Sequence, residues 1–310
     1  MNRARRVLTL RNANASNIQQ RAIKEEPQQQ KERPLSSLKF GGGTTLIPVE
    51  YSDDIDLYLR HLERRNKLSE GHLSVHNGVD GRMRQILVDW LVHVQVRFKM
   101  SIDTLSLSVH ILDRSLLALT EISKQNLQLL GVTCMFVASK YEEVVVPNIE
   151  DFVYVAANVF DRDDIMKMEQ RVLSGMNFNL SVPYSMHFLR RYRFYISPSK
   201  DVWVFAKFIS EVALVCYALA HHSPSVVAAV SIHLASFAFG IPLKSPELFG
   251  EVFRMAEKDV ARISRSFVDH VIQFLDPAEK LFALREKYRN QLNISNEQAL
   301  LLREFGDYLC

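Results

Sequence analysis

The chain has 310 residues, with 38 basic and 35 acidic side chains, and 47% of its residues are apolar. At roughly 150 residues per domain, this length predicts two folded units. The 18 Phe and 10 Tyr supply enough large side chains to offset the conformational entropy lost on folding, which excludes a wholly disordered chain.

The cysteines and the apolar runs limit the class of protein further. Cys134, Cys216 and Cys310 lie far apart and form no CxxC pair, which excludes a disulfide framework and a cysteine zinc ribbon. The first residues lack the apolar core of a signal peptide, and Cys310 is the last residue, which does not favour prenylation. Polar residues, Gly and Pro interrupt the longest apolar stretch, residues 226–243, as in a buried helix. We therefore expect a soluble protein of a reducing compartment with no membrane partner.

Residues 1–48 differ from the rest in charge and composition. They carry nine basic and three acidic side chains, a net charge of +6, which leaves −3 for residues 49–310 out of the total of +3. Their one aromatic residue is Phe40, and three consecutive glycines follow it at 41–43. Such a segment cannot bury a core, so we predict a disordered N-terminal tail over residues 1–48.

Helical periodicity begins directly after this tail. Ile55, Leu59 and Leu62 recur at i, i+4 and i+7, after Asp53 and Asp54, which predicts a first, exposed helix. Residues 82–98 repeat apolar positions at spacings of three and four over about four turns. Further helices are predicted at 104–120, 124–144, 149–159 and 163–173, with Asn148 and Asp161 as caps. The first unit therefore has five helices and no strand pattern.

A second group of helices follows a connector at residues 177–183. The pattern predicts helices at 185–195, 200–220, 225–239, 245–266 and 267–275, and a weaker pattern from Asp276 onward predicts an appended tail. The predicted fold is all-α, with two tandem five-helix units preceded by an N-terminal helix and the disordered tail. Its boundaries are 1–48 for the tail, 49–181 and 182–276 for the two units, and 277–310 for a C-terminal extension.

No constellation of residues typical of an enzyme occurs in the chain. GxGxxG, GxxxxGK[ST], HExxH and GxSxG are all missing, and the glycines at 41–43 follow no strand. His221 and His222 are adjacent, so on a helix they would point about 100° apart and could not share one metal ion. We expect a non-catalytic protein without a cofactor or a metal.

Nucleic-acid binding is the other class that a pI near 8.7 suggests. Because the folded part is net acidic, a track for phosphates would need clustered Lys and Arg on one face. The best local cluster is Arg190, Arg191 and Arg193, which is typical of a solvated helix face. We therefore expect no direct contact with nucleic acid.

The most informative segment is the helix that begins near Gly81. Met83, Ile86, Leu87 and Trp90 form one apolar stripe, and a second apolar face comes from the valines and leucine at 88, 91, 92 and 94. Such a helix is apolar on most of its circumference, so one face is available for a partner.

This segment, MRQILVDWLVHV at residues 83–94, resembles the cyclin-box signature, and its surroundings are similar to B-type mitotic cyclins. HILDRSLL (110–117), LQLLGVTCMFVASKYEE (127–143), MEQRVLSGMNFNL (168–180) and PYSMHFLRRY (183–192) match in the family's order and spacing. The resemblance implies two five-helix domains without an active site. It also implies that the protein binds a cyclin-dependent kinase, turns the kinase αC helix inward and so activates it.

The resemblance also assigns residues. Lys140 and Glu169 match the polar pair that holds the backbone beside the kinase αC helix, and the remaining kinase-binding residues are Val137, Tyr141, Glu142, Leu173, Phe178 and Leu180. Arg84 and Asp113 match a buried structural ion pair. The residues that match a hydrophobic docking groove for Arg-x-Leu segments of substrates and inhibitors are Met83, Ile86, Leu87, Trp90, Leu127 and Gln128.

Two assignments depart from the family pattern. His93 stands where an acidic residue often follows the groove Trp, which weakens the attraction for the Arg of a docking peptide or makes it pH dependent. B-type cyclins can hold a phosphorylated residue in a basic pocket of the second domain. Arg191 and Lys207 match two ligands of that pocket, whereas Trp203 replaces a His.

The tail carries a candidate signal for degradation. Arg5 and Leu8 supply the Arg-x-x-Leu core of a destruction box read by ubiquitin-ligase machinery, although the downstream positions depart from the pattern. We expect the protein in the nucleus and cytoplasm. The alternatives are an A-type or B3-type cell-cycle cyclin, or a DNA-binding transcription factor with tandem cyclin folds. The missing CxxC pairs and the acidic folded part argue against the transcription factor.

Overall fold

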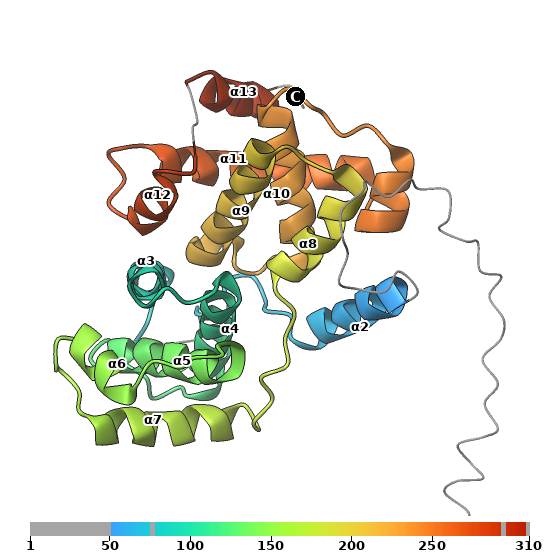
Figure 1. Ribbon diagram of the computed structural model, residues 1–310. Coiled ribbons are helices and arrows are strands. Elements are labelled where there is room, and N and C mark those ends of the chain that lie inside the picture. The colour runs from blue at the N-terminus through green and yellow to red at the C-terminus, as the bar shows by residue number, and fades with distance from the viewer. Residues whose placement is uncertain (1–50, 75–77, 293–295, 308–310) are drawn as a thin grey trace, which may run out of the picture. The chain divides into compact units, whose positions relative to one another are not determined.

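The computed structural model describes residues 51–74, 78–292 and 296–307, which form helices, helical turns and connecting loops (Figure 1). These residues contain no β-strand, so the predicted all-α class is confirmed for them. All of them belong to one unit that runs from Phe40 to Cys310. The tail predicted at residues 1–48 lies outside the described residues.

The first fold contains five helices, as predicted. They are α3 (Gly81–Phe98), α4 (Ile102–Ala118), α5 (Leu127–Glu142), α6 (Ile149–Val155) and α7 (Arg162–Gly175). α5 is the central helix, because it packs against α3, α4, α6 and α7. Ten of its residues are buried, which explains why its sequence shows no polar stripe.

Local polar contacts set the ends of these helices. The Asp161 carboxylate accepts a hydrogen bond from Asp164 N at 2.8 Å, so Asp161 caps α7 as predicted. At the start of α6, Asn148 N donates to the Asp151 carboxylate at 2.9 Å. α3 ends at Lys99, which adopts a left-handed φ of 55°.

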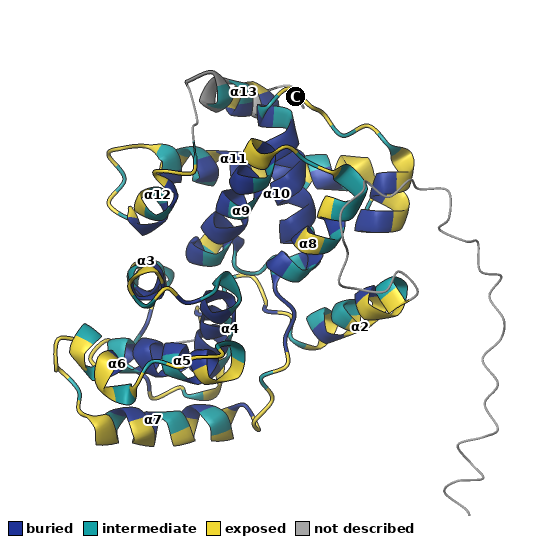
Figure 2. Ribbon diagram, viewed as in Figure 1, coloured by how far each residue is buried: buried dark blue, intermediate teal, exposed yellow. Residues whose placement is uncertain are grey.

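The second fold is built around α10 (Pro224–Ala238). This helix packs against α8 (Ser185–Ile196), α9 (Lys200–Val215) and α11 (Glu257–Leu275). Figure 2 shows α9 and α10 dark blue along most of their length, because nearly every face of both helices is covered. The sequence therefore places its most continuous apolar run, in α10, at the centre of the second fold.

The predicted helices at 245–266 and 267–275 are wrong in their boundaries. The structure has a short π turn, η4 (Leu248–Phe253), and then one continuous helix, α11, over Glu257–Leu275. Arg254 ends the π turn with a left-handed φ of 53°. α11 contains no Gly or Pro near Ser266 and Phe267, so the helix continues through the predicted boundary between these two residues. The prediction at 200–220 was also too long, since α9 ends at Val215 and a 3-10 turn, η3 (Tyr217–Leu219), follows.

The segments outside the two folds pack against them. α2 (Ser52–Arg65) precedes the first fold, as predicted, but its apolar stripe does not form a buried face, because Leu62 is buried whereas Ile55 is exposed. In the segment predicted as an appended tail, α12 (Ala283–Tyr288) packs on α3 and α9, and α13 (Asn296–Asp307) packs on α10 and α11. The domain boundaries themselves stay a prediction.

Candidate functional site

An ion pair joins the end of α5 to the middle of α7 on the surface of the first fold. Lys140 Nζ and Glu169 Oε1 form this pair, with 41% of the Lys140 side chain and 16% of the Glu169 side chain exposed. The Lys140 ammonium also lies 4.2 Å from the centroid of the Phe136 ring. The structure therefore brings together the two polar residues that the resemblance assigned, with their polar atoms facing solvent.

The other residues that the resemblance assigned to kinase binding include two exposed aromatic side chains. Tyr141 is 55% exposed and Phe178 is 71% exposed, whereas Leu173 and Leu180 are half-buried. Val137 is only 3% exposed, so it supports the surface from beneath and adds almost no contact area of its own. The residues predicted for the pocket thus include two exposed aromatic side chains, two half-buried leucines and one buried valine, and exposed apolar side chains of this size are typical of a partner surface when they gather together.

Phe178 is held in an unusual backbone conformation. Asn177 and Phe178 both adopt left-handed φ values, 50° and 56°, directly after α7. For a bulky side chain this conformation costs roughly 1–2 kcal/mol. Arg114 Nη1 fixes the loop by donating to the Asn179 carbonyl at 2.8 Å. The surrounding structure therefore holds a strained loop that exposes an aromatic ring.

Glu142 has a structural contact that the sequence did not reveal. Its carboxylate accepts a hydrogen bond at 2.8 Å from the hydroxyl of Tyr184, in the connector between the two folds. Burial, together with this carboxylate, raises the pKa of Tyr184 far above its usual value. Glu142, which was assigned to kinase binding, therefore uses one carboxylate oxygen to hold the connector against α5.

The predicted docking groove lies along α3. Ile86 is 52% exposed, and Met83 and Trp90 are partly exposed on the same side of the helix. Leu87 and Leu127 are buried beneath them, and Gln128 is partly exposed at the start of α5. A Cβ added to Gly131 would lie 2.7 Å from Leu87 Cδ1, so α5 needs glycine there to approach α3 closely. The six assigned residues therefore form a floor and one wall.

The opposite side of α3 carries a neighbour that the sequence did not reveal. α12 lies beside α3, as Figure 1 shows, and Ala283 N donates to the Asp89 carboxylate at 3.1 Å. The Phe282 ring lies 5.4 Å from the His93 ring in an edge-on contact. These residues lie in the segment with the weak helical pattern, which contains no signal that they pack against α3.

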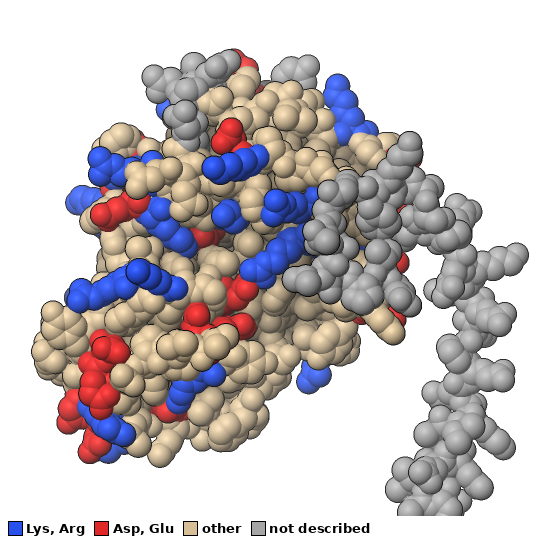
Figure 3. Space-filling view, in the orientation of Figure 1, with Lys and Arg blue, Asp and Glu red and all other residues tan. Residues whose placement is uncertain are grey.

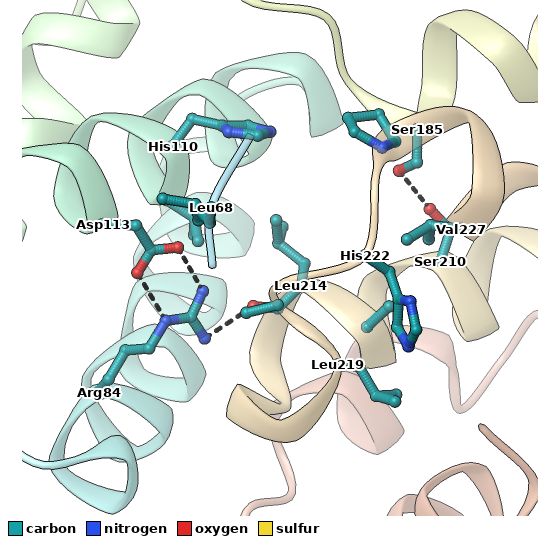
Figure 4. Close-up of a pocket in the computed structure, with 14 residues that line it drawn as sticks. Leu68, Arg84, His110, Asp113, Ser185, Ser210, Leu214, Leu219, His222 and Val227 are labelled. Carbon is teal, nitrogen blue, oxygen red and sulfur yellow. Dashed lines mark hydrogen bonds and ion pairs between the residues drawn. The ribbon is translucent and has the colours of Figure 1, made fainter. Parts of the chain in front are cut away.

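Arg84 and Asp113 form a buried, two-pronged ion pair between α3 and α4. Arg84 Nε and Nη2 donate to the two Asp113 oxygens, each at 2.7 Å, and only 1% of the Arg84 side chain is exposed. Arg84 Nη1 also donates to the carbonyls of Leu214 and Val215, at 3.1 and 3.0 Å, as Figure 4 shows for Leu214. Although burial works to raise it, Arg84 holds the pKa of Asp113 well below its usual range. The pair thus connects the first fold to the last turn of α9.

A small cavity of about 50 Å³ lies beside this ion pair, and the residues that line it come from both folds (Figure 4). Two of them are His110 and His222, and burial lowers the pKa of each to about 4. His221 and His222 lie in a turn and not on a helix, with ring centroids 4.1 Å apart. Among the described residues, no cluster of three His, Cys, Asp or Glu is placed to hold a metal ion.

Both residues predicted for the phosphate pocket, Arg191 and Lys207, have charged neighbours within the protein. Arg191 Nη2 pairs with Asp53 at 2.8 Å, and Arg191 Nη1 donates to the Ser52 carbonyl at 2.7 Å, so this arginine is engaged by α2. Lys207 is half-buried, and besides Glu211 its charged neighbours are Arg193 and Lys287. Burial, with these two cations, lowers the pKa of Lys207.

Lys and Arg side chains gather on the face of the molecule where α8, α9 and α12 lie (Figure 3). Arg193 stacks over Trp203 at 4.9 Å, on the same helices. The glutamate beside Lys207 is already engaged, because Glu211 pairs with Lys287 and accepts from Tyr288. If Lys207 takes part in an anion site, the geometry favours Arg193 over Arg191 as the second cation of that site.

α2 is attached to the second fold by charged contacts. Asp56 is fully buried, and its carboxylate lies 3.0 Å from Arg60, 3.3 Å from Arg254 and 3.5 Å from Arg191. Charged residues of α2 thus face the protein, whereas four large apolar residues in or directly before this helix are exposed; these are Tyr51, Ile55, Leu57 and Tyr58. The apolar spacing predicts the helix α2, but it does not predict which side of the helix packs against the protein.

Other expectations lie outside this geometry. Arg5 and Leu8, the candidate destruction box, lie outside the described residues. Within the described part of the chain, no helix has the length and apolar character needed to cross a bilayer.

Comparison with protein families gives two matches that together span most of the described chain. Residues 54–181 match the cyclin N-terminal domain, and residues 183–299 match the cyclin C-terminal domain.

The curated relatives are G2/mitotic-specific cyclins. The chain is 43% identical to cyclin-B of Arbacia punctulata over 198 residues, which is 64% of this chain and 48% of that protein. It is 35% identical to cyclin-B2 of Homo sapiens over 242 residues, 77% of this chain and 59% of that protein. It is 34% identical to cyclin-B2 of Oryzias luzonensis over 262 residues, 81% of this chain and 67% of that protein. The matches thus span about half to two thirds of the length of these relatives.

Solved structures show the same fold at low sequence identity. A viral cyclin from herpesvirus saimiri superposes with a TM-score of 0.61 and 19% identity, over 76% of this chain and 99% of that one. A chain of the yeast RNA Pol II CTD kinase CTDK-1 complex superposes with a TM-score of 0.53 and 15% identity, over 79% of this chain and 86% of that one.

Proposed function

The chain belongs to the cyclin family, in its B-type branch, and from this premise we propose that it is the regulatory subunit of a mitotic cyclin-dependent kinase. It drives the G2-to-mitosis transition and has no catalytic role of its own. The observation that carries this proposal is the Lys140–Glu169 pair, whose polar atoms face solvent beside an exposed aromatic patch.

The proposed mechanism is allosteric. Kinase activity requires the αC helix to turn inward, so that its Glu reaches the ATP-binding Lys. A ligand shifts that equilibrium only by binding the inward state more tightly. Lys140 and Glu169 would bind backbone polar groups beside αC, and Phe178 and Tyr141 would cover its apolar side. Together they would make the inward state the tighter-binding one.

The strained loop at Phe178 supports this role. A left-handed aromatic residue persists only where the surrounding structure enforces it, and such strain is common at binding sites. Burial of the ring against a partner helix would contribute roughly 1.5–3 kcal/mol, which is comparable to the strain or larger.

A reconstituted kinase assay tests the proposal. The purified chain should bind a mitotic cyclin-dependent kinase in a pull-down and stimulate its phosphorylation of histone. Lys140→Ala and Glu169→Ala should each raise the concentration needed for half-maximal activation by about tenfold or more, since each leaves a charge unpaired at the interface. Lys167→Ala is the matched control, because Lys167 is an exposed lysine of α7 without an ion pair in the described structure.

A chain that neither binds the kinase nor changes histone phosphorylation would contradict the proposal. In that case binding to duplex DNA in a gel-shift assay would favour the transcription-factor alternative. The acidic charge of residues 49–310 predicts that no such shift occurs.

We propose that the groove along α3 recruits substrates and inhibitors that carry Arg-x-Leu segments. Its apolar floor of Met83, Ile86 and Trp90 is exposed enough to receive a leucine side chain. Trp90→Ala should weaken binding of such a peptide, measured by fluorescence anisotropy, without changing activation on a short substrate that lacks the motif.

We also infer three properties that rest on the family resemblance and on charge. A phosphorylated segment of a partner binds at Lys207 with Arg193, a site that the gathered cations favour. The chain is degraded by the ubiquitin system through Arg5 and Leu8. It resides in the nucleus and cytoplasm. Arg5→Ala with Leu8→Ala should lengthen its half-life at mitotic exit, and an unchanged half-life would remove the degradation proposal.

A further inference from the structure

The proposed docking groove has a second wall that its sequence did not predict. At about 100° per residue, Ile86, Trp90 and His93 project from α3 within roughly 60° of one another and form one row. α5 flanks one side of this helix, and α12 flanks the side that carries Asp89 and His93. A peptide lying on the row therefore meets α12 as well as α5.

α12 presents a carboxylate at the end of this row. Glu286 Oε2 lies 3.9 Å from His93 Nδ1, and 63% of the Glu286 side chain is exposed. Among the described residues, His93 is its only ion-pair partner. The family's acidic position after the groove Trp is His93 in this chain, and the exposed carboxylate beside His93 comes from a different helix.

The other charged groups nearby are already engaged. Asp89 is buried and accepts from Ala283 N, and burial raises its pKa above the usual value. Arg285, the neighbour of Glu286 in the chain, donates to the carbonyls of Asp276 and Pro277 and so points to the backbone. Glu279, whose charge also acts on Asp89, already accepts hydrogen bonds from Gln273 Nε2 and from the backbone N–H groups of residues 280 and 281. Glu286 therefore remains the carboxylate beside this row that a ligand can reach.

We infer that Glu286 recognises the basic side chain of a docking peptide, with Phe282 and His93 as the aromatic edge over which that side chain passes. This inference rests on the proposed docking function of the groove. The occupant is a short extended peptide with an apolar residue on Ile86 and Trp90 and an Arg two positions away. Two extended residues span about 6.6 Å, and His93 lies roughly one turn beyond Trp90, so the Arg reaches the α12 edge.

Charge complementarity on an exposed site predicts a modest, specific effect. A labelled Arg-x-Leu peptide is titrated against the whole 310-residue chain by fluorescence anisotropy, beside a twin peptide with Gln in place of Arg. Glu286→Gln should weaken the Arg peptide roughly two- to fivefold and leave the Gln peptide unchanged. Glu286→Lys should weaken the Arg peptide by more, and high salt should reduce every difference. Glu251→Gln, at an exposed glutamate in η4, is the matched control and should change neither peptide.

The outcomes separate this inference from the docking function itself. If Trp90→Ala weakens the Arg peptide but Glu286→Gln does not, the groove functions and the role of Glu286 is wrong. If Glu286→Gln weakens the Arg and Gln peptides equally, Glu286 acts on the groove's shape and not on charge, which also overturns the inference. If the wild-type chain binds neither peptide, or Trp90→Ala has no effect, the docking function itself is wrong. Thermal melting of each variant checks that the exposed substitution leaves folding intact.

Discussion

Replacement of Arg84 by Ala should destabilise the protein more than most single substitutions. Arg84 makes two hydrogen bonds to Asp113 and two to the carbonyls of Leu214 and Val215, with 1% of its side chain exposed. Arg84→Ala removes all four and leaves the Asp113 carboxylate buried without its cation. Without Arg84, burial raises the pKa of Asp113, and taking up a proton still costs free energy at neutral pH because the carboxyl group is ionised in the unfolded chain.

The magnitude follows from these losses. Breaking a buried ion pair by removing one partner costs about 3–5 kcal/mol. Each carbonyl that loses its donor adds up to roughly 1–3 kcal/mol unless water replaces it. Water has room to enter, since the neighbouring cavity of about 50 Å³ is enlarged by the truncation. We therefore expect a net loss of about 3–5 kcal/mol, a large share of a typical stability of roughly 5–15 kcal/mol.

Urea denaturation followed by circular dichroism measures this loss, and thermal melting should show a fall of very roughly 6–20 °C. The double variant Arg84→Met with Asp113→Leu replaces both charges by apolar side chains and should recover much of the lost stability. It also keeps the test valid if Arg84→Ala does not fold. A midpoint for Arg84→Ala equal to that of the wild type would refute the reasoning, as would a double variant that is no more stable than the single one.

Three further predictions concern other parts of the structure. Phe178→Gly relieves the left-handed strain, so its free energy of unfolding, measured by urea denaturation, should stay within about 1 kcal/mol of the wild type. Its kinase affinity in a pull-down titration should fall at least fivefold. Burial lowers the pKa of His233 to about 4, so the unfolded chain binds more protons between pH 4 and 6.5, and stability rises with pH in that window. Acidification from pH 7 to 5 should therefore cost about 2 kcal/mol through this group. In urea titrations His233→Gln should remove that share of the fall, while the shares of His110 and His222 stay. Arg191→Ala should lower stability by about 1–3 kcal/mol and speed hydrogen exchange in α2, whereas an anion site at Arg191 would show no such change.

The fold could be predicted closely from the sequence because its helices carry clear signals. Long apolar runs with spacings of three and four gave every main helix from α3 to α11, and Asp161 marked a true helix start. The errors lie where backbone conformation overrides the pattern. Arg254 and the π turn before it have no sequence signal comparable to Gly or Pro, so two helices were placed where one π turn and one helix occur.

Contacts at the candidate site could be predicted where both residues of a pair lie within the motifs that resemble the family. Lys140 and Glu169 meet across α5 and α7, and Arg84 meets Asp113, because each pair is fixed by the packing of the first fold. The contacts of Arg191 with α2 were not predicted, because no local pattern shows that α2 packs against the second fold. Contacts between segments more than a hundred residues apart depend on tertiary packing, and periodicity carries no information about them.

α3 contacts a different part of the protein on each of its sides, and most of these contacts are with segments distant in the sequence. Arg84 reaches the second fold, Leu87 packs on α5, Asp89 holds α12, and Ile86 faces solvent. A substitution in the signature segment therefore changes stability or docking according to its side of the helix. Leu87→Ala should cost about 2–5 kcal/mol by leaving a cavity, whereas Ile86→Ala should leave stability nearly unchanged. Loss of peptide binding by Leu87→Ala would thus be evidence about folding, and only the exposed row can report on docking itself.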